Sequence, residues 1–293
     1  MNILVTGGAG FIGRYVCMNL INKGHKVIVY DYQRPEIKDV IFYSGCIQDR
    51  LKLWEAIEKA DAVIHLTGVL GTAETIDNPF LSIDVNITGS TNVFEACRKF
   101  EKRGVYIAVG NPFMNNSYSI TKTAAERLAL MYNKEHGTKI AIVRGLNVYG
   151  PYQKAKPVRK VIPNFCLPAI CDKPIIIYGS GNQVMDFIYA ADAAEVLSRA
   201  LLDDHNVYDK IFEAGSGQRT TINEIAEMVV KISDSKSEII HEPMRQGEIS
   251  DSVVVADTKT LEPLRLKPSD FVSMESGLKM TIEYYKRNFP SYQ

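Results

Sequence analysis

A chain of 293 residues, of which 46% are hydrophobic and 23% charged, has the composition of a soluble globular protein with a large core. Lysine plus arginine and aspartate plus glutamate both number 34, so no net charge favours nucleic acid or an anionic membrane as a partner. No apolar run has the length of a membrane span, and because a strand is predicted to begin at Asn2 we expect no signal or transit peptide. The five cysteines show neither a C-x-x-C motif nor metal-ligand spacing with histidine, so we expect a cytoplasmic protein without disulfides or a bound metal.

The chain opens with a predicted strand, a glycine-rich turn and a helix. Residues 3–5 are apolar, and apolar residues at helical spacing follow the turn. Within this stretch Gly7, Gly10 and Gly13 are spaced G-x-x-G-x-x-G. The first glycine permits a tight turn, the second lets the backbone approach a pyrophosphate, and the third lets the helix pack closely on the strand. Because the positive end of the helix dipole would hold the pyrophosphate, the stretch predicts a dinucleotide site.

A second predicted strand, residues 26–30, leads directly into a carboxylate. Asp31 follows the glycine triplet at the distance expected for a group that accepts hydrogen bonds from the adenosine ribose. This carboxylate would repel the 2′-phosphate of NADP, although Arg34 leaves an opening for that cofactor. We therefore predict NAD as the cofactor.

Strands and helices continue to alternate through the first half of the chain. The next strands are expected at 40–43, 62–65, 105–109 and 139–144, and the helices at about 51–59, 79–103 and 117–136. This alternation predicts a Rossmann-type fold, an α/β doubly wound parallel sheet with helices on both faces.

The composition changes after Gly150, where prolines separate short elements. Residues 211–215 are expected to form one more strand of the main sheet, and Thr221 with Glu224 predicts a capping box at the start of a helix. We predict an NAD-binding domain over residues 1–150, with returning segments near 184–216. Residues 151–183 and 217–293 are expected to form a smaller C-terminal substrate-binding lobe that covers the carboxyl ends of the strands.

The helix expected over 117–136 carries a phenol and an ammonium group on one face, since Tyr118 and Lys122 lie one turn apart. An isolated tyrosine has a pKa of about 10 and is a poor base at neutral pH. A nearby ammonium and the positive ring of an oxidised nicotinamide would both lower that pKa. Tyr118 is therefore predicted to take a proton from a hydroxyl while the carbon beneath gives hydride to the cofactor.

Further motifs extend along almost the whole chain. Together with the Tyr118/Lys122 pair, they are residues 6–13, which contain the glycine triplet, and residues 63–66, 84–89, 144–151, 178–181, 186–192, 213–217 and 245–248. Together they resemble the extended short-chain dehydrogenase/reductase family, in its nucleotide-sugar epimerase and dehydratase group. This resemblance implies a nucleotide-sugar substrate, retained NAD, and catalytic roles for Tyr118 and Lys122.

The resemblance also indicates which residues contact the cofactor. Ile47 would contribute backbone contacts, because Cys46 stands where the family often has an aspartate near the adenine. The full set implied is Gly7, Gly10, Phe11, Ile12, Gly13, Asp31, Ile47, Leu66, Tyr118 and Lys122.

One expected catalytic group is missing after the fifth strand. The family has a serine or threonine there that binds the reacting hydroxyl beside the tyrosine, whereas this chain has Ala108, Val109 and Gly110. Losing that hydrogen bond would weaken positioning of the substrate by about 1–3 kcal/mol. Ser117 and Thr72 are the candidate replacements.

The substrate side matches the family only in part. Asn147 matches the asparagine that contacts the sugar diphosphate, Arg245 matches an arginine that holds the nucleotide, and Tyr178 is a candidate for stacking on the base. A second diphosphate arginine is replaced by Met185, and loss of such a bidentate partner is not neutral. The cations that could compensate are Lys154, Lys156, Arg159 and Lys160.

The loop of residues 110–116 separates the possible reactions. The family's dehydratases carry an Asp-Glu pair there and its decarboxylases a glutamate, whereas this loop has no carboxylate. A C4 epimerase needs none, so we predict C4 epimerisation of a UDP-hexose or related sugar. A 4,6-dehydratase, a decarboxylase and a 4-keto reductase remain alternatives within enzymes, and a non-catalytic NAD(P)-sensing regulator is an alternative of another class.

The resemblance implies a homodimer that pairs through the helices around 84–103 and 118–136. The run Ala124, Ala125, Leu128, Ala129, Tyr132 has the small and apolar character that such packing requires, although a face buried within one chain would have the same pattern.

Overall fold

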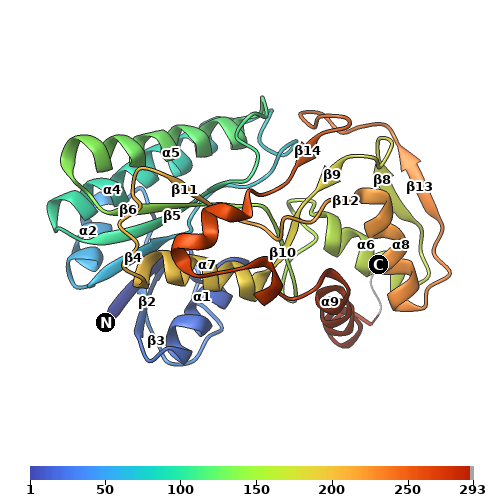
Figure 1. Cartoon of the computed structure of the whole chain (residues 1–293), viewed down its shortest axis with the longest axis horizontal. Helices are drawn as coiled ribbons and strands as arrows, with labels where there is room; N and C mark the ends of the chain where they lie inside the picture. The colour runs from blue at the N-terminus through green and yellow to red at the C-terminus, as the bar shows by residue number, and fades with distance from the viewer. Residues whose placement is uncertain (291–293) are drawn as a thin grey trace.

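The protein, described here by a computed structural model over residues 1–290, has a large sheet-containing body and a smaller lobe beside it (Figure 1). A seven-stranded parallel sheet has the order β11-β6-β5-β4-β1-β2-β3. The strands are β1 (Asn2–Thr6), β2 (Lys26–Asp31), β3 (Val40–Ser44), β4 (Ala62–His65), β5 (Arg103–Val109), β6 (Ile140–Gly145) and β11 (Ile211–Ala214). The predicted Rossmann-type fold is confirmed.

Both faces of the sheet are covered, because its strands carry apolar residues on both sides. In β1, Ile3 and Val5 pack in one core cluster and Leu4 packs in the other. The first face carries α1 (Phe11–Asn22) and α7 (Ala190–Leu202), and the second carries α2 (Arg50–Glu58), α4 (Ser90–Lys99) and α5 (Ser117–His136), as Figure 1 shows. Within residues 1–290, no helix combines the length and apolar character needed to cross a membrane.

The helix predicted over 79–103 is real, but its predicted end is wrong. It runs through α3 (Phe80–Ser82), a π-helical segment η1 (Ile83–Gly89) and α4. The chain then turns at Glu101, which has φ 52°, and the backbone N–H of Lys102 donates to the carbonyl of Cys97. A left-handed residue commonly closes a helix in this way. No glycine marks this end, so the sequence pattern predicted a helix as far as residue 103, where β5 begins.

The strand predicted over 211–215 does return to the main sheet, where β11 pairs with β6. Arg144 of β6 reinforces this edge by pairing with Glu126 of α5 at 2.8 Å and with Glu213 of β11 at 3.5 Å. The predicted capping box is also confirmed, since Thr221 and Glu224 cap the start of α8 (Ile222–Ser233).

The smaller lobe packs three helices around its own apolar core. They are α6 (Val161–Ala169), α8 and α9 (Met274–Asn288), and beside them β8 (Ile175–Tyr178) pairs with β13 (Ile239–Glu242). The short strands between the lobe and the main sheet are β7 (Asn147–Tyr149), β9 (Val184–Met185), β10 (Phe187–Tyr189), β12 (Thr220–Thr221) and β14 (Val253–Val254), and the helical turns η2 (Thr258–Leu264) and η3 (Pro268–Asp270) lead into α9.

One buried carboxylate fastens these connections. Asp186, between β9 and β10, accepts hydrogen bonds from the backbone N–H and hydroxyl of Ser216 at 2.8 and 2.6 Å, and from the N–H groups of Gly217 and Ala256 at 2.7 and 3.1 Å. Four donors satisfy a carboxylate whose burial would otherwise be costly. Three segments far apart in the sequence are thereby held at one point.

Candidate active site

The predicted cofactor residues meet where the strand order of the sheet reverses. β1 and β4 are neighbours, and the helices that follow them lie on opposite faces of the sheet. Gly7 follows β1 with φ 72°, and a Cβ atom there would lie 2.8 Å from the backbone nitrogen of Thr67, just past β4. Ligands of doubly wound sheets bind in the crevice at such a point.

The glycine triplet forms a cradle that a side chain would fill. A Cβ atom on Gly13 would lie 2.2 Å from the carbonyl oxygen of Gly7 and 2.7 Å from the Cα of Gly8, and one on Gly10 would lie 3.1 Å from the same oxygen. Helix α1 begins after Gly10 without a side-chain cap. Its first N–H groups are therefore available for an anionic group, as the first turn of a helix provides. This geometry fits a dinucleotide pyrophosphate.

Asp31 lies at the carboxyl end of β2, as the sequence indicated. Its carboxylate accepts hydrogen bonds from the N–H groups of Ala9, at 3.1 Å, and Gln33, at 3.0 Å. It is thus fixed beside the glycine turn. The guanidinium of Arg34 lies 5.3 Å from the centre of the Phe42 ring, on the neighbouring strand β3.

The other predicted cofactor residues line the same edge of the sheet. Phe11 and Ile12 form the first turn of α1. Leu66 follows β4 and donates its N–H to the carbonyl of Thr6 at 3.1 Å. Ile47 is buried, and its carbonyl accepts from the side chain of Asn92 at 3.1 Å. Their contacts with a cofactor remain predictions.

Helix α5 begins with a firmly held turn that carries Tyr118. The side chain of Asn116 caps the helix by accepting from the N–H of Ser119 at 2.9 Å, and the Ser119 hydroxyl donates to the carbonyl of Asn111 at 2.6 Å. Lys122 follows one turn later, 3% exposed, with its ammonium nitrogen 4.2 Å from the centre of the Tyr106 ring. The phenol and the amine therefore share one face of the helix, as predicted from their spacing.

The protein groups around this pair do not lower the pKa of the tyrosine. Burial raises the pKa of Tyr118 to about 12. Burial also lowers the pKa of Lys122 to about 7, against a smaller raising effect from Glu126. Desolvation thus leaves the amine partly neutral at pH 7 and limits the help that Lys122 gives to the phenolate, whereas the contribution predicted for the oxidised nicotinamide stays a prediction.

Asn86 is a structural residue of this site to which the sequence assigned no role. Its side-chain nitrogen donates to the carbonyl of Val69 and to the hydroxyl of Thr121, both at 3.0 Å, and its oxygen accepts from the N–H of Val69 at 2.8 Å. The amide thus ties the chain leaving β4 to α5. A Cβ atom on Gly68 would lie 3.7 Å from the Lys122 nitrogen, which places this segment directly beside the lysine.

The backbone leaves no room for a side chain at Gly110, one of the three positions at the end of β5 where a hydroxyl is expected. A Cβ atom on Gly110 would lie 2.9 Å from both the carbonyl oxygen of Gly145 and the Cα of Leu146. A serine at this position would clash with backbone unless the connection after β6 moved. Ser117 opens α5 next to Tyr118, and Thr72 lies in the loop that follows β4. Both side chains are partly exposed and stay candidates for the missing contact.

Arg245 and Tyr178, predicted on the substrate side, lie together in a charged cluster. Arg245 pairs with Glu248 at 2.8 Å and with Glu74 at 3.6 Å, and its guanidinium lies 5.8 Å from the centre of the Tyr178 ring. The Tyr178 hydroxyl accepts a hydrogen bond from Arg159. Glu74 was not predicted from the sequence, since nothing in the local pattern relates this loop residue to an arginine so distant in the chain.

Asn147 lies in β7 with its amide group directed at the β9–β10 connection. Its side-chain nitrogen donates to the carbonyl of Asp186 at 2.9 Å and lies 3.7 Å from the sulfur of Met185. That nitrogen is therefore already engaged, and a contact of Asn147 with a sugar diphosphate remains a prediction that would fall to its oxygen.

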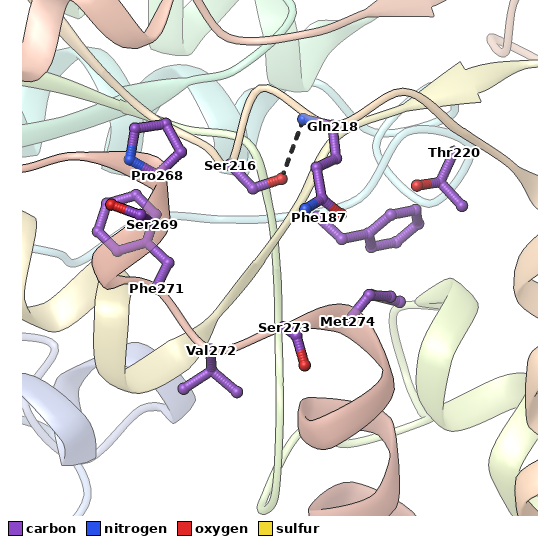
Figure 2. A pocket seen from close by; sticks show the side chains of 10 residues that line it. All are labelled: Phe187, Ser216, Gln218, Thr220, Pro268, Ser269, Phe271, Val272, Ser273 and Met274. Carbon is purple, nitrogen blue, oxygen red and sulfur yellow. Dashed lines mark hydrogen bonds between the residues drawn. The ribbon is translucent and has the colours of Figure 1, made fainter.

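A pocket of about 210 Å³ lies elsewhere, between the loop after β11 and the start of α9 (Figure 2). Figure 2 shows the Phe187, Thr220 and Met274 side chains grouped at one side of it. At its edge, the Ser216 hydroxyl accepts from the N–H of Gln218 at 3.2 Å. Its lining includes none of the predicted site residues, so we assign it no part in the chemistry.

Comparison with known proteins agrees with this geometry. Residues 3–215 match the model of the NAD dependent epimerase/dehydratase family. The chain belongs to this family. The match runs from β1 to the end of β11 and therefore includes every strand of the main sheet.

Relatives within the family share the full length of the chain. A UDP-N-acetyl-alpha-D-glucosaminuronate decarboxylase of Bacillus cytotoxicus is 29% identical over 316 residues, covering 97% of each chain. A UDP-glucuronate 4-epimerase of Thermodesulfobacterium geofontis is 29% identical over 319 residues, covering 97% of this chain and 96% of the relative. The crystal structure of a UDP-glucose 4-epimerase from Thermotoga maritima, with UDP-glucose, superposes with a TM-score of 0.90 at 28% identity, covering 98% and 99%.

Membership establishes the class of protein. It is an NAD-dependent enzyme of the nucleotide-sugar epimerase, decarboxylase and dehydratase type. NAD is the cofactor predicted from the sequence. The glycine cradle and the uncapped start of α1 fit its pyrophosphate, and Asp31 fits its adenosine ribose.

The buried Lys122 gives a testable consequence for stability. Its pKa is about 7 in the fold and about 10.4 in an unfolded chain, so unfolding takes up a proton between these values. Stability of the wild type should then rise with pH across this window, because the unfolded state binds more protons. Lys122→Met removes the buried charge and should stabilise the protein at pH 7 by on the order of 3 kcal/mol, a gain that shrinks toward pH 10.

Denaturant unfolding of both proteins, stripped of NAD, at pH 7, 8 and 9.5 measures this gain. Comparing the variants at each pH cancels the titration of other groups. Two results would contradict the conclusion that burial of the Lys122 charge lowers stability at pH 7. One is a Lys122→Met variant less stable than wild type, and the other is a stability difference that does not change with pH.

Proposed function

We propose that the enzyme epimerises a UDP-hexose or a related nucleotide sugar at C4, through a transient 4-keto sugar. The observation that carries this proposal is the Tyr118/Lys122 pair at the edge of the sheet where the glycine cradle lies, together with a 110–116 loop that lacks any carboxylate. Hydride transfer and its reversal need one acid–base group, whereas elimination and related chemistry need more.

The side chains have separate roles in this proposal. Tyr118 takes the proton of the C4 hydroxyl and later returns it, and Lys122 stabilises the phenolate by its charge when protonated. NAD, when bound, supplies the hydride acceptor and a positive ring that favours the phenolate. Ser117 or Thr72 would bind the reacting hydroxyl in place of the family's serine. Asn147 and Arg245 would hold the nucleotide diphosphate, and Tyr178 would stack on the base.

A decarboxylase is the second candidate, because one of the full-length relatives carries that name. Within the resemblance drawn above, decarboxylases place a glutamate in the loop after the fifth strand, where this chain has residues 110–116 without one. The epimerase proposal therefore stands first, and a uronic acid substrate must be included in any test.

Product analysis by NMR tests the proposal directly. The purified enzyme would be incubated with UDP-, TDP-, GDP- and CDP-hexoses and with the corresponding uronic acids, without added cofactor. We expect a C4 epimer of one of them and no net consumption of NAD. A shortened sugar with released CO₂ would identify a decarboxylase, a stable 4-keto-6-deoxy product a dehydratase, and a requirement for added NADH a reductase.

The oligomeric state is a further part of the proposal, and one of its arguments needs correction. Ala125, Ala129 and Tyr132, read as a dimer face, are buried within the chain itself. The helices of residues 80–99 and 117–136 nevertheless expose large apolar side chains: Phe80, Leu81, Ile83, Ile120 and Met131. These residues support a homodimer, which sedimentation analysis would detect.

We also propose which parts of the chain bind the cofactor and which bind the substrate. Residues 1–150, with the returning segments near 184–216, would bind NAD, and residues 151–183 and 217–293 would bind the sugar nucleotide. A cytoplasmic location rests on the cysteine pattern given above.

A further inference from the structure

The substrate side of this chain departs from its family at one position, and the structure shows what surrounds the gap. Met185 stands where a second diphosphate arginine is expected, and its sulfur faces the Asn147 amide at 3.7 Å. A thioether offers a diphosphate neither charge nor a donor. An enzyme that keeps a nucleotide-diphosphate substrate therefore needs a cation from another part of the chain.

Three segments bring charged groups together beside the start of α5, two of them carrying cations and one the carboxylate of Glu74. They are the loop after β4, the segment that enters α6, and the turn of residues 245–248. The turn lies against the active-site helix, since Asn116 donates to the carbonyl of Gly247 at 3.4 Å. A Cβ atom on Gly247 would also lie 2.6 Å from the side chain of Ile76, so the turn contacts the loop after β4 as well. The cluster therefore adjoins the start of α5, where Asn116 lies two residues before Tyr118.

The candidate cations in the basic run differ in their surroundings. Lys154 and Lys156 are exposed to solvent, and Arg159 is exposed while lying over the Tyr178 ring. Lys160 is partly buried at the residue that precedes α6, which has no side-chain cap. Burial lowers the pKa of Lys160, Glu74 and Glu248 raise it, and Arg245 lowers it further.

Lys160 is the partly buried cation of this run, and it has no close partner among the described residues. Among the described residues its ammonium makes no ion pair within 4 Å, although two carboxylates lie in its field. Arg245, in contrast, is held by Glu248 through its Nε at 3.1 Å and a terminal nitrogen at 2.8 Å. A partly buried ammonium beside a fixed arginine is suited to an anionic group of a ligand.

Of the two carboxylates in the cluster, Glu74 is held more weakly than Glu248. Its contact with Arg245 is 3.6 Å, longer than either contact of Glu248, and its oxygen also accepts from the N–H of Arg159 at 3.1 Å. It reaches these groups from a loop whose Gly71, with φ 121°, lies against it. A carboxylate held in this way can be exchanged for a more highly charged anion, because both compete for the same cations.

We propose that Lys160 replaces the missing arginine as a ligand of the substrate's diphosphate, and that Glu74 is the counter-ion that the diphosphate displaces from Arg245. The inference rests on the proposed function, since it assumes a nucleoside diphosphate group in the substrate. It assigns Lys160 a positioning role that no family motif indicates. It also makes the loop after β4 responsive to the substrate, because Glu74 must leave the cluster when the diphosphate enters.

Calorimetric titration of the NAD-loaded enzyme tests this assignment. The probes are UDP, TDP, GDP and CDP, and then the monophosphate of whichever binds wild type most tightly. Lys160→Met should weaken binding of that diphosphate about 10- to 100-fold, and of the monophosphate less, whereas Lys160→Arg should restore it to within about threefold. Glu74→Gln should tighten diphosphate binding by about 3- to 10-fold. Lys279→Met, an exposed lysine of α9, is the matched control and should bind as wild type does.

The possible outcomes distinguish a failure of this inference from a failure of the proposed function. If wild type binds none of the nucleotides, both the inference and the proposed substrate class are overturned. If wild type binds one of them but Lys160→Met binds as Lys279→Met does, or loses both nucleotides equally, the role of Lys160 is overturned and the proposed function stands. Weaker diphosphate binding by Glu74→Gln would overturn the role of Glu74.

Discussion

Tyr118→Phe should slow turnover of the nucleotide sugar by at least about a hundredfold while leaving NAD and the fold in place. The phenol is the titratable group that opens α5 beside the cofactor edge, and the substitution removes only its oxygen. Acid–base catalysis by a positioned side chain contributes about 10²- to 10⁴-fold, so kcat should fall by that factor.

Steady-state rates followed by NMR or by coupled detection of the epimer would measure this loss. Tyr106→Phe is the matched control, since Tyr106 is a buried tyrosine whose hydroxyl donates to the carbonyl of Lys122 at 3.2 Å. That variant should lose some stability and keep most of its kcat. A Tyr118→Phe enzyme that retains more than a tenth of wild-type kcat would remove the tyrosine from its proposed role.

Gly13→Ala should destabilise the protein and abolish NAD binding, although alanine is ordinarily the better helix residue. In a helix interior the change from glycine to alanine gains about 1 kcal/mol. Here the new Cβ atom would lie 2.2 Å from the carbonyl oxygen of Gly7 and 2.7 Å from the Cα of Gly8, both backbone atoms that cannot rotate away. The turn predicted to hold the pyrophosphate must therefore shift, which should lower the free energy of unfolding by about 1–3 kcal/mol or more.

Thermal unfolding and NAD titration measure the two effects of Gly13→Ala together. Gly24→Ala provides the comparison, because Gly24 lies just past the other end of α1 with φ 81° and no atom within 4 Å of its would-be Cβ. It should lose about 1 kcal/mol through backbone strain and bind NAD as wild type does. Unchanged NAD affinity in Gly13→Ala would show that helix α1 is not packed on the turn as described.

Features set by short stretches of sequence were predicted well. The glycine triplet, Asp31 after β2 and the Tyr118/Lys122 spacing each depend on a few neighbouring residues, and the structure places all of them at one edge of the sheet. The strand at 62–65 and the helix at 117–136 have the predicted bounds, because apolar alternation and caps define them locally.

Features that depend on distant residues were not predictable from the pattern. The Glu74–Arg245 contact joins two loops, and the space around Gly110 is closed by the backbone of residues 145 and 146. The pKa of Lys122 depends on how deeply α5 is buried, which spacing along a helix does not reveal. The end of α4 was misplaced for a simpler reason, since Glu101 makes the turn that a glycine usually signals.

The late return of β11 to the sheet affects how the enzyme is made. During synthesis β6 emerges long before residues 211–214, so its outer edge stays without hydrogen-bond partners while the whole β7–α7 region is translated. Arg144 likewise lacks its ion-pair partner Glu213 until β11 has been translated. An open strand edge of this kind invites pairing with other chains, so a nascent chain, or a fragment cut at residue 150, should depend on chaperones to remain unaggregated.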